Sequence, residues 1–266
     1  MASEQIRGRT SIGPEITDVA GEPTEATQLE RLVARYHWAA SYSEGATMLE
    51  VACGTGQGLG LFRSRAERVF ACDISSENLA IAQKGNGSLQ PLVRADAQAL
   101  PFPDESLDLV VLMEAIYFLP SATAFLSEAT RVLKRGGVCL VSAINKDCVD
   151  FNPHHSLYQR LYGVRDLSSD FREQGLMPEC FGIIPMDQPS LRSRVFKPVK
   201  KMAVGLNIIP ESKRARLFLK RVVFGSLQTM PDDISKLSPP AVKPQRLSID
   251  RPDSVHQVVL CAGKRS

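Results

Sequence analysis

The chain of 266 residues contains no apolar run that approaches the roughly 18 residues needed to cross a bilayer. Its first twenty residues are polar and are interrupted by Gly8, Gly13 and Pro14. They therefore lack the apolar core of a signal peptide. These two absences predict a protein that stays in the cytoplasm.

The cysteines show no C-x-x-C pair and no close pairing with histidine, which excludes the usual spacing of a zinc site. We therefore expect no bound metal and reduced thiols. Several of these cysteines lie in predicted buried strands, where cysteine behaves as a small hydrophobic residue. The six are Cys53, Cys72, Cys139, Cys148, Cys180 and Cys261.

The net charge of +3 is small, and positive charge is concentrated in one segment. Residues 191–222 hold ten lysines and arginines and a single acid, Glu211. Apolar residues recur there at helical spacing on both sides of Pro210, which predicts two basic amphipathic helices. Such helices suit an anionic membrane surface, a phosphate-bearing substrate or nucleic acid, or their charges are simply solvated. Only 6% of residues are aromatic, so stacking on bases, and with it nucleic acid, has the least support.

The most informative motif couples an acidic residue to three closely spaced glycines after an apolar, strand-like start. It reads MLEVACGTGQG and spans residues 48–58. Glycines allow the backbone to approach a ligand closely, so the motif predicts a turn that holds a nucleotide. The dinucleotide fingerprint fails, because Leu59 or Leu61 stands where its last glycine is required. A triphosphate loop would end in Gly-Lys-Ser/Thr, which is also missing.

Three further segments follow at intervals typical of alternating strands and helices in a parallel sheet. Residues 69–74 form a short apolar strand that ends at Asp73, and residues 91–97 form a second strand that ends at Asp96. The run 109–113 is apolar without alternation, which predicts a central strand buried on both faces. Ser75 or Ser76 can cap the helix that follows the first of these strands.

These motifs resemble those of class I S-adenosylmethionine-dependent methyltransferases of the small-molecule type, the type 11 methyltransferases. LEVACGTGQG corresponds to the first family motif, ACDIS to the ribose motif and ADAQALPFPDESLDLVV to the adenine motif. EATRVLKRGGVCLVSAIN corresponds to the following helix, turn and fifth strand, and residues 258–262 to the last strand. The resemblance implies an α/β fold with a Rossmann-like, doubly wound, mostly parallel sheet. Its last strand is antiparallel, and a helical basic insertion precedes that strand.

The resemblance also implies S-adenosylmethionine as the cofactor and a set of residues that bind it. Glu50 would hold the amino acid end, Asp73 would accept the ribose hydroxyls, and Asp96 would read the adenine amino group. Ala52 departs from the glycine of many relatives, but alanine is small enough that we expect the cofactor to fit. The full set of implied contacts is Tyr36, Glu50, Ala52, Gly54, Gly56, Asp73, Ile74, Asp96, Ala97 and Glu114.

A helix is predicted over residues 27–42, with an apolar face that includes Tyr36. In the resembled family a leading helix often covers the cofactor. Tyr36, His37 and Trp38 are thus candidates for lid or substrate contacts, with packing in the core as the alternative. We expect a flexible arm over 1–24, a cofactor-binding core over 25–146, an acceptor-binding lid over 147–253 and a closing strand over 254–266.

The acceptor is less constrained than the cofactor. RYHWAA, EAIYFLP and the residues Asn145-Lys146-Asp147 also resemble methyltransferases of bacterial polysaccharide and natural-product assembly. We therefore expect transfer to an oxygen of a small-molecule, sugar or glycolipid acceptor. The alternatives are transfer to nitrogen or carbon, or a non-catalytic S-adenosylmethionine-binding module that recruits partners through the basic helices.

A general base assists transfer to a hydroxyl more than transfer to an amine. The candidates are His154 and His155, in the loop after the fifth strand, and Tyr117, after the fourth. The two histidines could equally be solvated loop residues, and His256 precedes a strand and is expected to be structural. The sequence does not indicate an oligomeric state.

Overall fold

The computed structural model describes residues 19–86, 91–149, 157–185, 227–241 and 243–266. The predicted basic helices of residues 191–222 lie outside these ranges, as do His154 and His155. Among the described helices, none combines the length and the hydrophobicity needed to cross a membrane.

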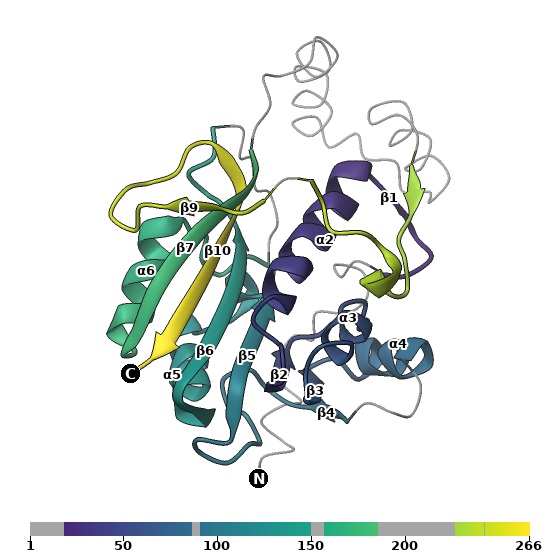
Figure 1. Ribbon diagram of the computed structural model, residues 1–266, viewed down its shortest axis with the longest axis horizontal. Coiled ribbons are helices and arrows are strands. Elements are labelled where there is room, and N and C mark those ends of the chain that lie inside the picture. The colour runs from purple at the N-terminus through teal and green to yellow at the C-terminus, as the bar shows by residue number, and fades with distance from the viewer. Residues whose placement is uncertain (1–18, 87–90, 150–156, 186–226, 242) are drawn as a thin grey trace.

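The fold is built on one sheet of eight strands in the order β4-β3-β2-β5-β6-β10-β7-β9 (Figure 1). The first five strands in this order pair in parallel, and β10 pairs antiparallel with both β6 and β7. The predicted antiparallel last strand is therefore confirmed. The strands are β2 (Thr47–Val51), β3 (Arg68–Asp73), β4 (Leu92–Arg94), β5 (Leu107–Met113), β6 (Leu133–Ile144), β7 (Leu176–Pro185), β9 (Gln245–Leu247) and β10 (His256–Arg265).

Helices cover both faces of this sheet (Figure 1). One face carries α2 (Ala26–Ala40), α3 (Leu59–Arg63) and α4 (Ser76–Asn86), and the other carries α5 (Ala122–Val132) and α6 (Val164–Glu173). The described residues also include two short 3-10 turns, η2 (Ile116–Phe118) after β5 and η3 (Ile234–Lys236) before β9. The predicted leading helix is confirmed as α2.

Two apolar clusters, one on each face of the sheet, form the core. Alternate residues of β5 enter different clusters: Val110 and Leu112 pack towards α5 and α6, whereas Leu109 and Val111 pack towards α2 and α3. These four side chains are at most 1% exposed. Burial on both faces explains the unbroken apolar run that predicted a central strand.

The order of the strands locates the place where a ligand can bind. From β2 the chain continues to β3 and β4 on one side, and then crosses to β5 and β6 on the other side. In open α/β sheets, ligands bind beyond the carboxyl ends of the strands where the order reverses. The ends of β2 and β5, at Val51 and Met113, mark this position.

Two elements differ from the sequence-based division of the chain. The predicted lid segment 147–253 contains α6 and β7, and β7 is a full member of the sheet between β10 and β9. Pro178 within β7 argues against a strand, because proline cannot donate to a ladder, and this obscured the element. In the predicted flexible arm, Pro23–Thr24 forms strand β1, which pairs with β8 (Gln228–Thr229).

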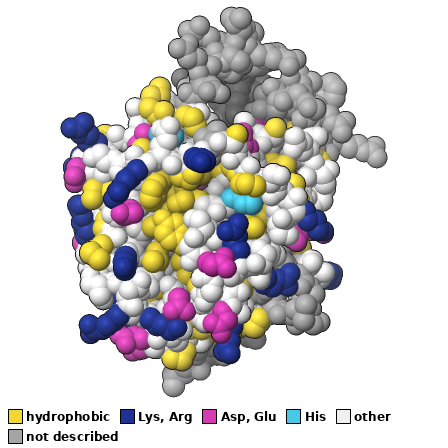
Figure 2. All heavy atoms as spheres, in the orientation of Figure 1, with side chains coloured by type: hydrophobic (Ala, Val, Ile, Leu, Met, Phe, Trp, Pro, Cys, Tyr) yellow, Lys and Arg dark blue, Asp and Glu magenta, His cyan; other side chains and the backbone are white. Residues whose placement is uncertain are grey.

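Charged side chains of both signs are interspersed on the face of the molecule shown in Figure 2, and hydrophobic side chains gather in a patch among them. Within the described residues visible there, positive charge is not collected in a single area.

Candidate functional site

The glycine turn after β2 uses left-handed backbone at three positions. Ala52, Gly54 and Gly56 have φ of 54°, 55° and 80°. Residues with a Cβ rarely adopt this conformation, whereas glycine adopts it freely. Glycine would be the favoured residue at the position of Ala52, and alanine, with only a methyl group, is among the smallest departures from it.

Asp73, at the end of β3, holds this turn in place. Its Oδ2 accepts a hydrogen bond of 2.9 Å from the amide of Gly54, and its Oδ1 accepts one of 2.8 Å from the amide of Ser75. The side chain is 5% exposed, and burial raises the pKa of Asp73 although these hydrogen bonds oppose the shift. Oδ1 also accepts a hydrogen bond of 3.4 Å from the side-chain amide of Asn78. Because each carboxylate oxygen offers roughly two acceptor positions, Oδ2, which accepts from Gly54, retains capacity for a ribose hydroxyl. Ser75 also caps α4 by accepting from the amide of Asn78, which confirms one of the two predicted caps.

Glu50, in β2 beneath the turn, is 1% exposed. Its Oε1 accepts a hydrogen bond of 2.6 Å from the hydroxyl of Tyr36, whereas its Oε2 is buried and has no partner among the described residues. Burial raises the pKa of Glu50 to about 8, against the opposing effects of the Tyr36 hydrogen bond and the Arg35 charge. Burial likewise raises the pKa of Tyr36 well above its usual value, so the phenol keeps the shared proton.

The unpaired Oε2 of Glu50 tests whether the site suits S-adenosylmethionine. A buried acceptor without a partner is costly until a donor reaches it. The amino acid end of S-adenosylmethionine carries an ammonium group, which is such a donor. With the left-handed turn above Glu50 and Asp73 beside it, the residues present fit this cofactor.

Gly58, the third glycine of the motif, has a different function from the first two. A Cβ at this position would overlap the ring of Tyr36. Gly58 therefore makes room for Tyr36, whose ring also packs against Phe62 at a centroid distance of 5.6 Å. The structure brings the predicted residue Tyr36 to the site through this contact and through Glu50.

The residues predicted to contact adenine lie at the ends of β3 and β4. Oδ1 of Asp96 accepts from the backbone amide and the side-chain amide of Gln98, at 2.9 and 3.1 Å. Ile74 is half-buried and Ala97 is buried. Asp96, Ile74 and Ala97 thus lie at the same edge of the sheet as Asp73.

Glu114, directly after β5, has left-handed backbone with φ of 53°. Its amide donates to both the carbonyl and the hydroxyl oxygen of Ser142 in β6, at 3.1 and 3.0 Å. Its Oε2 accepts a hydrogen bond of 3.0 Å from the Tyr117 hydroxyl, and its Oε1 is buried without a partner among the described residues. Burial raises the pKa of Tyr117 well above its usual value.

The other two candidates on α2 behave differently from Tyr36. Trp38 is 7% exposed and packs against Tyr42 and Phe181, with ring centroids 5.4 and 6.1 Å apart, which is the core-packing alternative. A ring nitrogen of His37 lies 3.1 Å from the carbonyl oxygen of Leu237, so this side chain links α2 to the residues after η3.

Arg35 is a site residue that the sequence analysis missed. It is 8% exposed, and its guanidinium lies 5.9 Å from the centroid of the Tyr36 ring. Its charge opposes the burial that raises the pKa of Glu50, Tyr36 and Tyr117. Arg35 therefore lies within electrostatic range of both the Glu50 pair and the Glu114 pair. An arginine directly before Tyr36, on a helix whose apolar face packs on the sheet, was the available signal.

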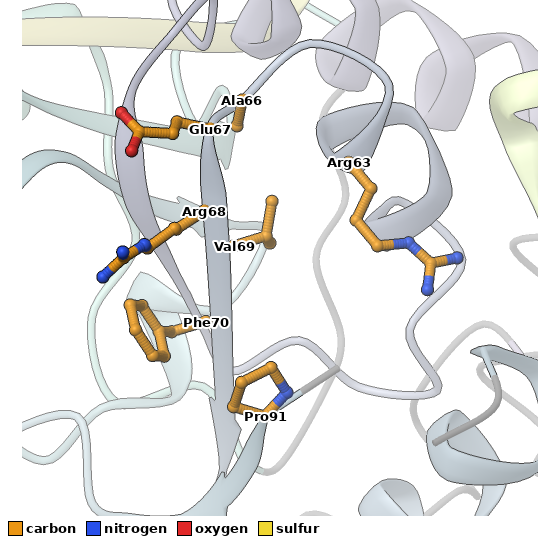
Figure 3. A pocket seen from close by; sticks show the side chains of 7 residues that line it. All are labelled: Arg63, Ala66, Glu67, Arg68, Val69, Phe70 and Pro91. Carbon is orange, nitrogen blue, oxygen red and sulfur yellow. The ribbon is translucent and has the colours of Figure 1, made fainter. Parts of the chain in front are cut away.

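A pocket of about 360 Å³ lies elsewhere, beside the start of β3. Arg63 of α3 and Pro91, which precedes β4, flank it together with Val69 (Figure 3). Because this is the opposite end of β3 from Asp73, the pocket is separate from the glycine turn.

A model of the methyltransferase domain matches residues 49–141 of the chain. The fatty-acid O-methyltransferase of Mycolicibacterium smegmatis is 35% identical over 123 residues, which cover 44% of this chain and 45% of that protein. The probable phthiotriol/phenolphthiotriol dimycocerosates methyltransferase 2 of Mycobacterium ulcerans is 30% identical over 182 residues, 65% of this chain and 68% of that protein. The chain spans about half the length of the first curated relatives that it matches.

The fold is similar to that of solved methyltransferases. The structure of an S-adenosylmethionine-dependent methyltransferase from Thermotoga maritima superposes with a TM-score of 0.57 at 17% identity. The superposition covers 90% of this chain and 92% of that chain.

Proposed function

Because the chain belongs to the S-adenosylmethionine-dependent methyltransferases, we propose that it transfers a methyl group to an oxygen of a small-molecule, sugar or glycolipid acceptor. The observation that carries this proposal is the arrangement at the ends of β2 and β3. There the orphaned oxygen of Glu50, the left-handed turn and the buried carboxylate of Asp73 meet at the point where the strand order reverses.

Each of these groups has a defined part in binding. Glu50 would bind the ammonium of S-adenosylmethionine, Asp73 would accept the ribose hydroxyls, and Ile74 with Asp96 and Ala97 would surround the adenine. When bound, S-adenosylmethionine supplies a methyl carbon activated by a positively charged sulfur. The task of the chain is then to orient the acceptor in line with this carbon and to exclude water, which accounts for much of the rate enhancement.

One similarity supports oxygen as the methylated atom, and two support a lipid acceptor. The relative from M. smegmatis is named for O-methylation of a fatty acid, and the relative from M. ulcerans is named for a methyl transfer in dimycocerosate lipids. Both acceptors are lipids, which favours the lipid members of the proposed acceptor class.

Of the three residues predicted as candidates for the general base, the structure describes one. His154 and His155 lie outside the described residues and stay predictions. Tyr117 is described, but its hydroxyl donates to Glu114 and burial raises the pKa of its phenol. A phenol held as a donor is a poor proton acceptor, so Tyr117 is better suited to positioning.

Two measurements test the proposed function. Thermal unfolding should show stabilisation by S-adenosylmethionine and by S-adenosylhomocysteine, and no shift with NAD, because a ligand that binds only the folded state raises its stability. Incubation of the protein with a lipid extract and S-adenosylmethionine that carries a labelled methyl group should then label a methyl ether product. Stabilisation by NAD alone would contradict the family assignment, and cofactor binding without any labelled product would favour a non-catalytic module.

A further inference from the structure

The direction of the Glu114 side chain is set by a strained, left-handed backbone conformation. Left-handed φ is unfavourable in a residue with a Cβ and persists only when the surroundings enforce it. Here the two hydrogen bonds from its amide to Ser142 enforce it. Such strain is common where a side chain must be presented to a ligand.

The free end of this side chain is an acceptor without a donor. Oε1 is buried and has no hydrogen-bond partner within the described part of the chain, while Oε2 is fixed by the Tyr117 hydroxyl at 3.0 Å. Leaving a buried carboxylate oxygen unpaired is unfavourable, so the arrangement is complete only when a donor arrives.

A donor that binds Oε1 of Glu114 would lie close to the cofactor-binding turn. β5 pairs with β2 through Val51 and Leu112, so Glu114 follows its strand at the same edge as the glycine turn. Arg35 lies within electrostatic range of both Glu50 and Tyr117, which joins the two carboxylate pairs into one region.

An aromatic wall stands beside this carboxylate. The ring centroids of Tyr117 lie 4.7 Å from Phe118 and 5.0 Å from Tyr158, and Phe118 lies 5.4 Å from Tyr158. Phe118 and Tyr158 are only half-buried. A wall of this kind suits the hydrocarbon part of an acceptor.

We propose that Glu114 is the general base of the transfer, with Tyr117 as its positioning residue, and that the acceptor is a neutral hydroxyl compound with an apolar body. This role replaces the cofactor contact that the family resemblance implies for Glu114, and it rests on the proposed function. An ionised carboxylic acid is excluded as the acceptor, because its negative charge would meet the carboxylate of Glu114 in a desolvated place.

The proposed step is balanced in atoms and charge. The acceptor oxygen forms a bond to the methyl carbon while the bond from that carbon to sulfur breaks, and the sulfur keeps the electron pair. The hydroxyl proton passes to Oε1 of Glu114. The positive charge on sulfur and the negative charge of Glu114 are both neutralised.

The test compares three C16 probes with the same chain: hexadecane-1,3-diol, hexadecanoic acid and hexadecylamine. The native protein should methylate the diol and leave the acid and the amine unmodified. Glu114→Gln should lower kcat for the diol by about a hundredfold or more, the range for loss of a general base, with KM and the Kd of S-adenosylhomocysteine unchanged. Tyr117→Phe should lower kcat less, again without a change in KM.

Glu105→Gln is the matched control. Glu105 has the same φ of 53° and precedes β5, but it is exposed and forms an ion pair with Arg265. This variant should keep native kcat. In Glu114→Gly, which also removes the backbone strain, added formate should restore part of the rate, whereas a purely structural glutamate would show no such rescue.

Stability gives a measurement that does not depend on turnover. Because Glu114 keeps a buried oxygen unpaired, Glu114→Gln should leave the Tm of the unliganded protein unchanged or raise it. A Tm lowered by many degrees would instead make Glu114 a structural residue.

The outcomes separate this proposal from the proposed function. Absence of S-adenosylhomocysteine binding would overturn the function itself. Cofactor binding with methylation of the acid or the amine, or with none of the three probes methylated, would overturn the proposed acceptor class. Undiminished transfer to the diol by Glu114→Gln would overturn Glu114 as the base.

Discussion

The hydroxyl of Tyr36 donates a hydrogen bond of 2.6 Å to Glu50, and this bond joins α2 to the strand beneath the glycine turn. Helix and strand are thereby coupled at the place where the amino acid end of the cofactor would bind.

The first prediction concerns the proton of Glu50. Burial raises its pKa from an ordinary 4.5 to about 8, so the folded protein holds this proton more tightly than the unfolded chain does. The free energy of unfolding of the unliganded protein should therefore fall as pH rises from about 4.5 to about 8. An ammonium beside Glu50 favours its ionised form, so binding of S-adenosylhomocysteine near pH 7 should release a proton.

Calorimetry in two buffers with different ionisation enthalpies measures that release. Glu50→Gln serves as the control, because it cannot lose a proton and should bind without this release. Binding by the native protein that is independent of the buffer would show that Glu50 does not meet the ammonium.

A second prediction concerns Asp73. Its replacement by alanine would remove the acceptor for the amides of Gly54 and Ser75, so the fold would lose stability together with affinity. Asp73→Asn keeps a side-chain oxygen but removes the charge. We expect a Kd for S-adenosylmethionine that is raised roughly tenfold to a hundredfold, equivalent to about 1.5–3 kcal/mol for a charge-assisted hydrogen bond.

Titration calorimetry gives the affinity, and thermal unfolding of the unliganded variant reports on the backbone contacts. Asp104→Asn is a suitable control, since the side chain of Asp104 is 73% exposed and far along the chain from the turn. An unchanged Kd in Asp73→Asn would remove Asp73 from the cofactor site.

Much of this site could be predicted because its residues lie at strand ends within short motifs. Glu50, Gly54 and Asp73 occur at fixed distances from apolar runs, and parallel strands bring their carboxyl ends to one edge. The partner of Glu50 could not be found in this way. Tyr36 comes from a helix earlier in the chain, and its reach depends on the absence of a side chain at Gly58.

Two further features could not be predicted from the sequence, because they depend on contacts between distant residues. The left-handed backbone of Glu114 depends on hydrogen bonds to Ser142, 28 residues later, which no local propensity encodes. Strand β7 was not predicted, because it contains Pro178, which lowers its local strand propensity. Its place in the sheet depends instead on pairing with β10 on one side and β9 on the other, and both partners lie far away in the sequence.

The third prediction follows from the contact between Gly58 and Tyr36. In Gly58→Ala the added methyl group would overlap the Tyr36 ring and displace its hydroxyl from Glu50. We expect a lower Tm and weaker binding of S-adenosylmethionine. Gly85→Ala is the control, because a Cβ there has no heavy atom within 4 Å and should stabilise α4 by up to about 1 kcal/mol. Native affinity in Gly58→Ala would show that Tyr36 is dispensable for binding.

The fourth prediction decides between Glu114 and the histidines as the base. If Glu114 accepts the proton, the double variant His154→Ala, His155→Ala should keep kcat within a few-fold of the native value with the same acceptor. If a histidine is the base, kcat should fall by about a hundredfold or more with unchanged cofactor affinity. Single-turnover measurements with labelled S-adenosylmethionine separate the transfer step from product release.

The last prediction concerns the basic segment 191–222, with its ten lysines and arginines and one acid. We propose that it brings the protein to an anionic membrane surface, where a lipid acceptor would be found. Vesicles with acidic lipid should bind the protein at low salt, and neutral vesicles should bind it far less. Replacement of five of the cations by glutamine should abolish vesicle binding and leave cofactor affinity unchanged. The five are Lys197, Lys200, Lys201, Lys213 and Arg214.

Salt dependence and a charge-matched control show whether the effect belongs to this segment. Binding should fall steeply as ionic strength rises, because charges are screened beyond about 10 Å at 0.1 M salt. The control variant removes an equal number of exposed cations from the described part of the chain: Lys84, Arg135, Lys243, Arg251 and Lys264. If both variants lose binding equally, net charge alone drives the interaction. Absence of binding to acidic vesicles at low salt would instead favour a solvated segment, because a basic surface that docks on lipid must do so where screening is weakest.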